Sequence, residues 1–267
     1  MTLFHIFLVA LIQGLTEFLP VSSSGHLILL PRLTGLEDQG QVIDVAVHVG
    51  TLFAVVIYFW ADVKIGLLGL PRMLRGRIDT AGAHLALLLT IATIPVIILG
   101  LILKVTGLSD AMRSITVIGW TMIIFGIVLY IADTRSAQTR TAGDWLLKHA
   151  FIMGLWQALA LIPGTSRSGA TISGARALGY TRRDSAKLAM LMSIPTIIAS
   201  GVLLGIDVVG EANSAQIRDA AIAAVFSFLA ALFALGLMMR LLQSISFTPY
   251  VIYRIALGLV LLGIAYS

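Results

Sequence analysis

The sequence predicts an all-α integral membrane protein, because both its composition and its long apolar runs exceed what a water-soluble chain allows. Of its 267 residues 58% are hydrophobic and 12% are charged, and the mean hydropathy is +0.99. A soluble domain is about half apolar and about one quarter charged. Lipid must therefore solvate most of this surface, which argues against a soluble protein with an oversized core.

Ten apolar stretches divide the chain, and six of them are long enough to cross about 30 Å of hydrocarbon. The six predicted transmembrane helices are 43–60, 84–103, 114–132, 186–206, 219–241 and 250–266. The other four form two pairs, 3–33 and 148–180, and each pair breaks at a proline followed by serine and glycine. Irregular backbone at membrane depth has to line a protein cavity, so each pair is predicted to be a re-entrant helix–loop–helix.

The two breaks resemble one element used twice. The first follows Gly14-Leu-Thr-Glu17 and the second follows Gly154-Leu-Trp-Gln157, about half the chain later. Each half then holds one re-entrant pair and three spans, and an odd number of spans makes the second half enter from the opposite face. We therefore predict an inverted-topology repeat in one membrane domain, with the first repeat at 1–135 and the second at 145–267.

Basic residues in the loops predict the orientation. The side that holds the N-terminus carries four: Arg32, Lys104, Arg113 and Arg218. The other side carries eleven: Lys64, Arg72, Arg75, Arg77, Arg135, Arg140, Lys148, Arg182, Arg183, Lys187 and Arg240. Cytoplasmic loops carry the excess of Lys and Arg, so both termini are expected to face outward.

Composition also removes several classes of function. The formal charge of +5 comes without any Lys/Arg-rich run interleaved with aromatic residues, so we expect no nucleic-acid partner. The chain has no cysteine, which excludes disulfides, thiolate metal sites and cysteine nucleophiles. The N-terminal residues lack a basic region and a small-residue cleavage site, so no removable signal peptide is expected.

The first candidate site lies at residues 13–26. Gln13 and Glu17 share one helix face, and an acid deep in an apolar segment is a functional candidate by default. Pro20 ends the helix, and the next half-helix begins with residues that could bind an anion through free N–H groups: Ser22, Ser23, Ser24 and Gly25. His26 follows about one turn into that half-helix. The alternative is that the serines only cap a helix and His26 only packs.

The second candidate site lies at residues 162–174 and centres on Arg167. An arginine at a re-entrant tip needs an anionic partner, and a guanidinium fork fits phosphate oxygens. The surrounding small and hydroxyl residues would let the backbone approach and would add donors: Gly164, Thr165, Ser166, Ser168, Gly169 and Thr171. The alternative is an internal salt bridge from Arg167 to Glu17, which is also the pairing expected in an empty site.

Together the two loops suit a di-anionic or tri-anionic headgroup near the middle of the membrane. Glu17 could hold a divalent cation that bridges phosphate oxygens. A serine or His26 could attack phosphorus, while Arg167 and the N–H groups stabilise the equatorial oxygens of the transition state.

At these residues the chain resembles the BacA-type undecaprenyl pyrophosphate phosphatase family, and the resemblance spans nearly the whole chain. Gln13 and Glu17 fit its Glu/Gln-x-x-x-Glu motif. Four further segments fit family segments: PVSSSGH at 20–26, PGTSRSGAT at 163–171, SIPTIIASG at 193–201 and ISFTPYVIYR at 245–254. These motifs are long and specific.

The resemblance implies an enzyme that hydrolyses undecaprenyl diphosphate and so recycles the lipid carrier for peptidoglycan. It implies dependence on Mg²⁺ or Ca²⁺, a bacterial inner-membrane location, an active site open to the periplasmic face, and bacitracin resistance. Carried over by position, Glu17 is the acid that binds metal or acts as base, and Ser23 is the proposed nucleophile. His26 is a base or alternative nucleophile, and Arg167 binds the diphosphate with Ser166 and Thr171. A metal-bound water also fits the role of nucleophile.

One position departs from many relatives, because Gln13 stands where they have glutamate. A metal site with two carboxylates is then incomplete unless Asp44 contributes. Asp44 and His48 share a helix face near the outer end of the first span, where they would line the entrance or pair locally.

Three other kinds of protein share parts of this pattern. A lipid phosphatase of the phosphatidic acid phosphatase type would need a histidine six positions after Arg167, where Ser173 stands. A secondary transporter or lipid flippase shares the inverted-repeat architecture but would release no phosphate. A membrane scaffold leaves Glu17, His26 and Arg167 unexplained. Small-residue-rich spans would permit a homodimer.

Overall fold

The computed structural model describes residues 1–35, 39–108, 112, 114–208 and 213–267. These residues are helical almost throughout, and within them extended pairing is limited to one isolated bridge between Arg140 and Tyr180. Six helices are long and apolar enough to cross a membrane: α4 (Gly40–Tyr58), α6 (Ala81–Thr106), α8 (Ile115–Arg135), α11 (Arg182–Val208), α12 (Ser214–Leu241) and α13 (Thr248–Tyr266). They coincide with the six predicted spans, so the all-α membrane fold is confirmed.

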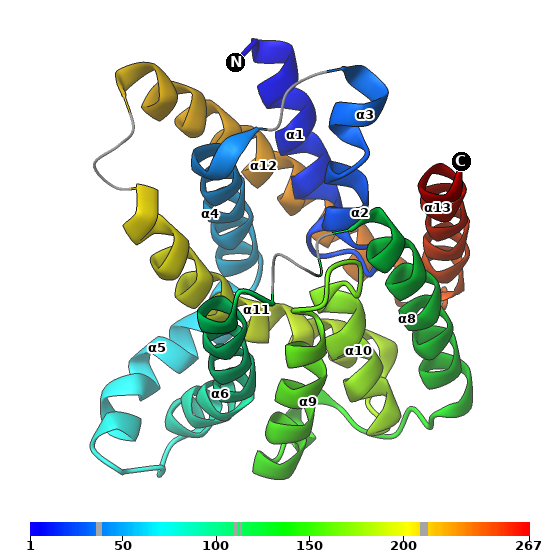
Figure 1. The fold of residues 1–267 in the computed structure, drawn as a ribbon. Coiled ribbons are helices and arrows are strands. Elements are labelled where there is room, and N and C mark those ends of the chain that lie inside the picture. Colours follow the sequence, from blue (N-terminus) through cyan, green and yellow to red (C-terminus); the bar gives the residue numbers. More distant parts are fainter. Residues whose placement is uncertain (36–38, 109–111, 113, 209–212) are drawn as a thin grey trace.

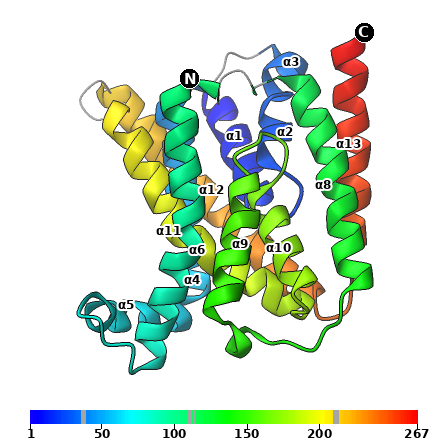
Figure 2. The same cartoon turned by 60° about the horizontal axis from the view of Figure 1, so that its bottom comes forward.

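Two hairpins lie among these helices and enter from opposite ends of the bundle. The first consists of α1 (Leu3–Thr16), α2 (Ser23–Leu27) and α3 (Leu30–Thr34), and the second of α9 (Leu147–Leu159) and α10 (Arg167–Ala177). Both chain termini and the first hairpin lie toward one end, and the second hairpin lies toward the other (Figures 1 and 2). This arrangement fits the predicted pair of re-entrant hairpins.

The predicted half-helix at 22–33 is in fact two short helices. Pro31 lies at the start of α3 and has no N–H group to continue the helical ladder from α2. The chain therefore bends at Ile28 and Leu29, between the two helices.

Equivalent glycines pack the first helix of each hairpin against its neighbour. A Cβ on Gly14 of α1 would lie 2.6 Å from Ala230 of α12, and a Cβ on Gly154 of α9 would lie 2.6 Å from the carbonyl oxygen of Ala92 in α6. Helices α6 and α12 hold the same position in the two predicted repeats. The matched contacts fit an inverted repeat, and they explain why glycine stands at both positions.

The structure adds a helix that the sequence analysis missed, α5 (Trp60–Leu74). The segment is short and contains charged residues and Pro71, so it did not qualify as a span. It packs on the start of α6 through Gly69 and Gly82, which are in direct backbone contact. An ion pair of 2.7 Å between Asp62 and Lys187 joins it to α11. A 3₁₀ turn, η1 (Ala142–Asp144), precedes α9.

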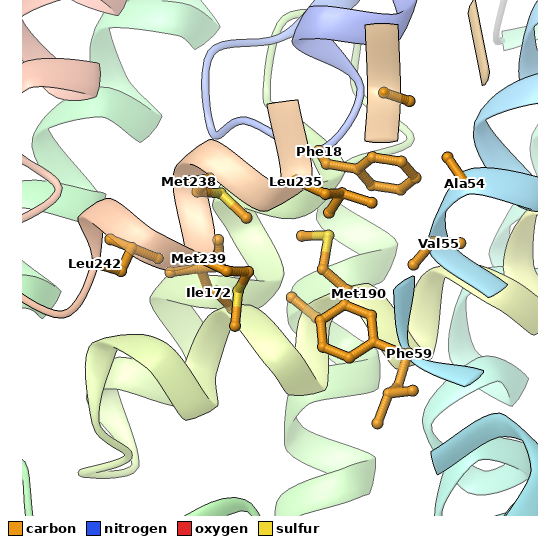
Figure 3. Close-up of a cluster of buried hydrophobic side chains, with 14 of the residues drawn as sticks. Phe18, Ala54, Val55, Phe59, Ile172, Met190, Leu235, Met238, Met239 and Leu242 are labelled. Carbon is orange, nitrogen blue, oxygen red and sulfur yellow. The ribbon is translucent and has the colours of Figure 1, made fainter. Parts of the chain in front are cut away.

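A core of apolar side chains lies between the hairpins and the spans, and it fixes the position of both loops. Phe18, which follows the first helix, and Ile172 of α10 are both fully buried in it. Val55 of α4, Met190 of α11 and Leu235 of α12 converge on the same cluster (Figure 3). Because close-packed interiors resist small displacements, the cluster holds the two loops in a fixed relation.

The ends of the bundle match the two sides used to count basic residues. Both termini lie at one end, and α5 and the segment before α9 lie at the other (Figures 1 and 2). Arg113, one of the four basic residues assigned to the terminal end, lies outside the described residues.

Candidate active site

The two loops contain the same turn. Ser22 (φ 71°) and Ser166 (φ 68°) are the non-glycine residues with positive φ in the described part of the chain. Each hydroxyl contacts the serine hydroxyl two residues later, at 3.0 Å for Ser24 and 3.2 Å for Ser168. Such a conformation costs about 1 kcal/mol or more and gathers at functional sites. It places Ser23 and Arg167 at the first positions of α2 and α10.

Glu17 and Arg167 join the two loops. Arg167 Nη2 donates to Glu17 Oε1 at 2.7 Å, and the two side chains are 16% and 8% exposed. Gln13 Nε2 donates to the other carboxylate oxygen, also at 2.7 Å. The salt bridge predicted for the empty site is therefore confirmed. Gln13 Oε1 is buried and has no hydrogen-bond partner in the part of the chain that the structure describes.

His48 completes this cluster. Its Nδ1 lies 2.7 Å from the carbonyl oxygen of Asp44, so that nitrogen carries the proton and donates. The other nitrogen, Nε2, then accepts from Gln13 Nε2 at 3.2 Å and lies 3.9 Å from Glu17 Oε2. The Asp44 carboxylate accepts from Gln39 at 2.8 Å. His48 thus borders the site, and Asp44 supports it from behind.

A cavity of about 240 Å³ opens beside the ion pair. Seven of the predicted site residues line it: Glu17, Ser22, Ser23, Ser24, Gly164, Ser166 and Arg167. His48 also lines it, together with four residues that the sequence analysis did not single out: Ala160, Thr196, Ile197 and Ser200. Within the described residues, the Ser23 hydroxyl makes no hydrogen bond.

The remaining predicted residues of the second loop lie behind the cavity wall. Ser168 donates to the carbonyl of Leu19 at 3.0 Å, which ties α10 to the first loop. Thr171 donates to the carbonyl of Arg167 at 2.9 Å, and Thr165 is fully buried. These residues shape the site from behind.

Two predicted residues of the first loop also lie outside the cavity lining. His26 Nδ1 is 2.8 Å from the carbonyl of Ser22, and Nε2 is 2.7 Å from the Tyr253 hydroxyl. The two rings also stack, with 5.5 Å between centroids. Gly25 packs against Met122, whose sulfur a Cβ would approach to 2.5 Å. A catalytic role for His26 stays a prediction.

Comparison with known proteins places this geometry in a family. Residues 6–260 match the family described as "Bacitracin resistance protein BacA". The chain belongs to the BacA family. A protein of Ruegeria pomeroyi named "Undecaprenyl-diphosphatase" is 72% identical over all 267 residues of both chains. Proteins with the same name from Dinoroseobacter shibae and Maricaulis maris are 71% identical over both whole chains and 45% identical over 98% of each.

In this BacA-family chain, two oxygen groups of the kind that Mg²⁺ and Ca²⁺ prefer lie next to each other. The Glu17 carboxylate lines the cavity, and Gln13, whose Oε1 has no hydrogen-bond partner among the described residues, is buried behind it. Among the described residues no three His, Cys, Asp or Glu side chains gather as a metal cluster. Mg²⁺ is often held by one or two carboxylates together with substrate phosphates, and the residues present fit that arrangement.

The sequence analysis assigned no role to one buried charge, Arg254 of α13, although this residue ends the segment 245–254 that resembles the family. Its side chain is fully buried and contacts the carbonyls of both loops. The signal was available, because an arginine within a predicted span is costly and therefore functional by default.

Proposed function

We propose that this BacA-family chain is a membrane phosphatase that hydrolyses undecaprenyl diphosphate to undecaprenyl phosphate and inorganic phosphate. One observation carries the proposal: Glu17 and Arg167 meet at a polar cavity between two opposed hairpins, beside the unbonded hydroxyl of Ser23. Two relatives that match the chain over its full length, at 72% and 71% identity, carry the corresponding name.

Arg167 would bind the diphosphate. Its guanidinium donates to Glu17, and a phosphate offers two oxygens to the same fork. The N-terminus of α10 adds free N–H groups and the positive end of the helix dipole. The cavity is of the size of a phosphate-bearing headgroup, so the prenyl chain would remain in the lipid.

Ser23 would act as the nucleophile. Its oxygen forms a bond to the terminal phosphorus, and the bond from that phosphorus to the bridging oxygen breaks. The serine proton ends on the departing undecaprenyl phosphate. Water then hydrolyses the phosphoserine, which releases inorganic phosphate and restores the hydroxyl. Arg167 and the α10 N–H groups stabilise the charge on the equatorial oxygens in both steps.

A divalent cation, Mg²⁺ or Ca²⁺, is proposed as cofactor. Glu17 and Gln13 Oε1 would hold it, and when bound it neutralises phosphate charge. With one carboxylate in its own set, this chain would rely on the substrate phosphates to complete the ligands. We expect binding of the cation to be weaker without substrate than with it.

The positive-inside rule supports a periplasmic opening for the site. With eleven basic residues on one side and four on the other, both termini face the periplasm of the bacterial inner membrane. The product would re-enter the lipid carrier cycle of peptidoglycan synthesis, and removal of undecaprenyl diphosphate would protect the cell from bacitracin. A homodimer is also proposed, and the mass of the protein in detergent would test it.

Phosphate release in detergent tests the proposed function. Purified protein with undecaprenyl diphosphate and Mg²⁺ or Ca²⁺ should release inorganic phosphate, and the variant Glu17→Ala should release almost none. A secondary transporter or flippase needs two compartments and would release none in detergent. If the wild-type protein releases no phosphate with either cation, the proposed function is wrong.

A further inference from the structure

Arg254 of α13 connects the two loops from beneath the cavity. Its Nη1 donates to the carbonyl of Pro20 at 3.3 Å, and its Nη2 donates to the carbonyls of Gly164 and Thr165 at 3.2 and 2.8 Å. Pro20 belongs to the first loop, and Gly164 and Thr165 belong to the second. One guanidinium thus holds the turns that precede Ser23 and Arg167.

The guanidinium fits closely into this position. A Cβ on Gly169, in the first turn of α10, would lie 2.6 Å from Arg254 Nη1. The side chain is 0% exposed. The space is therefore filled by the planar guanidinium, and only a side chain with several donors in fixed directions can bind all three carbonyls from that position.

The charge of Arg254 has no acidic partner within the described residues. Its guanidinium donates to the three carbonyls, and among the same residues its Nε has no hydrogen-bond partner. Burying a charge without a counter-charge is costly. Arg176 shows the contrast within the same chain: it is equally buried, but its charge is paired with Asp133 at 3.0 Å.

The hydrogen bonds of Arg254 also set the direction of one backbone amide. In a trans peptide the C=O and N–H groups point in opposite directions. Since the Thr165 carbonyl points at Arg254, the N–H of Ser166 points away from it. Ser166 borders the cavity, and in the described chain its N–H makes no hydrogen bond. That N–H is therefore a fixed donor available to an anion.

We infer that Arg254 is a positioning residue of the diphosphate site, whose charge is balanced by the phosphates of the substrate. It orients the Ser166 amide and keeps Ser23 and Arg167 in register. This inference rests on the proposed function and deepens it. The ligand chemistry is a diphosphate, because a buried, uncompensated cation favours a polyanion held nearby.

Two substitutions separate the charge of Arg254 from its hydrogen bonds. Arg254→Met removes both, so we expect KM for undecaprenyl diphosphate to rise at least about tenfold and kcat to fall at least about tenfold. Arg254→Lys keeps the charge but loses the fork. We expect its KM to stay within about threefold of wild type while kcat per folded enzyme falls at least about tenfold.

Arg176→Lys is the matched control. It changes an equally buried arginine that lies at the other end of α10 and contacts no residue of the cavity lining. It should lower the midpoint of thermal unfolding, and it should leave KM and kcat per folded enzyme within about twofold of wild type. A loss of folded protein alone lowers apparent kcat and does not move KM, so the two effects can be told apart.

The outcomes are distinguishable. If Arg254→Met folds and keeps wild-type KM and kcat, the inference is wrong. If Arg254→Met fails to fold, Arg254→Lys decides, and wild-type values for it overturn the inference. A wild-type protein that releases no phosphate overturns the proposed function and this inference together, whereas an active wild type with unaffected variants overturns this inference alone.

Discussion

Glu17 and Arg167 form an ion pair of 2.7 Å although 150 residues separate them in the chain. Each side chain comes from a different hairpin, and both are largely buried. A buried ion pair pays a desolvation penalty that can exceed its Coulombic gain, so stability alone is a poor reason to keep it. A site in which Arg167 releases the Glu17 carboxylate and binds a substrate phosphate explains why both charges are present.

Removing the guanidinium of Arg167 should abolish most activity. Arg167→Ala leaves the transition-state oxygens without their fork, and loss of one such donor costs about 10²–10³ in kcat. Arg167→Lys should also be poor, because a point charge cannot bind in a bidentate way. Phosphate release measures the effect. Arg218→Ala, which removes an exposed guanidinium paired with Asp219, should keep full activity, and equal losses in both alanine variants would contradict the site.

Substitution of the two candidate nucleophiles should give different results. Ser23→Ala removes the oxygen that attacks phosphorus in the first step of the proposed mechanism, so turnover should fall about 10³-fold or more. His26 is engaged by Ser22 and Tyr253, so His26→Gln should retain much more activity. Rapid quenching of wild-type protein with substrate in a denaturing detergent at neutral pH, where phosphoserine and phosphohistidine both survive, should trap a phosphoserine at Ser23. Recovery of phosphohistidine instead would reverse the assignment.

A second carboxylate beside Glu17 should strengthen cation binding. Gln13→Glu places an acid where the Gln13 amide now donates to Glu17, and added ligand charge raises the affinity for hard cations. The Mg²⁺ concentration that gives half-maximal activity should fall about tenfold. An unchanged metal dependence would remove Gln13 from the cation site.

The glycine contacts of the hairpins should be sensitive to a single methyl group. Gly14→Ala and Gly154→Ala would each put a Cβ 2.6 Å from a neighbouring helix, and overpacking costs about 1–3 kcal/mol. Thermal unfolding in detergent should shift to lower temperature for both. Gly263→Ala, where no atom lies within 4 Å of the added Cβ, is the control and should not lower stability.

Orientation can be tested with single cysteines, because the chain has none of its own. The start of α12 lies at the end of the bundle that holds the termini, and the segment before α9 lies at the opposite end (Figures 1 and 2). Ser214→Cys introduces a thiol in the first of these places and Thr139→Cys in the second. An impermeant maleimide applied to intact spheroplasts should label the first and not the second. The reverse labelling pattern would mean that the termini face the cytoplasm, and the predicted periplasmic opening of the cavity would then be wrong.

Composition and run length were enough to predict the fold class, the six spans and the two breaks. The length of an apolar stretch is a strong signal in a membrane protein, because the thickness of the bilayer sets how long a transmembrane helix must be. The α5 helix was not predicted, because its charged residues and Pro71 lower the mean hydropathy of the segment below that of a membrane span. The break between α2 and α3 could have been predicted from Pro31, because proline cannot continue the hydrogen bonding of a helix.

The charged residues of the candidate site were predicted from the sequence, but the residues that line its cavity were predicted only in part. Glu17 and Arg167 are recognisable because an intramembrane charge requires a reason. Thr196 and Ser200 lie in the segment 193–201 that resembles the family, but hydroxyl residues in a span often bond back to their own helix, so the sequence did not indicate that these two line the cavity. Which hydroxyls face the cavity depends on helix rotation, which tertiary packing decides.

A structure with a non-hydrolysable diphosphate analogue bound would show directly which groups bind the phosphates. We expect the analogue to occupy the cavity between the hairpins, with Arg167 moved from Glu17 to its oxygens and with Ser23 Oγ in line with the scissile bond. Density for the analogue at any other place, with the pair of Glu17 and Arg167 intact, would contradict it.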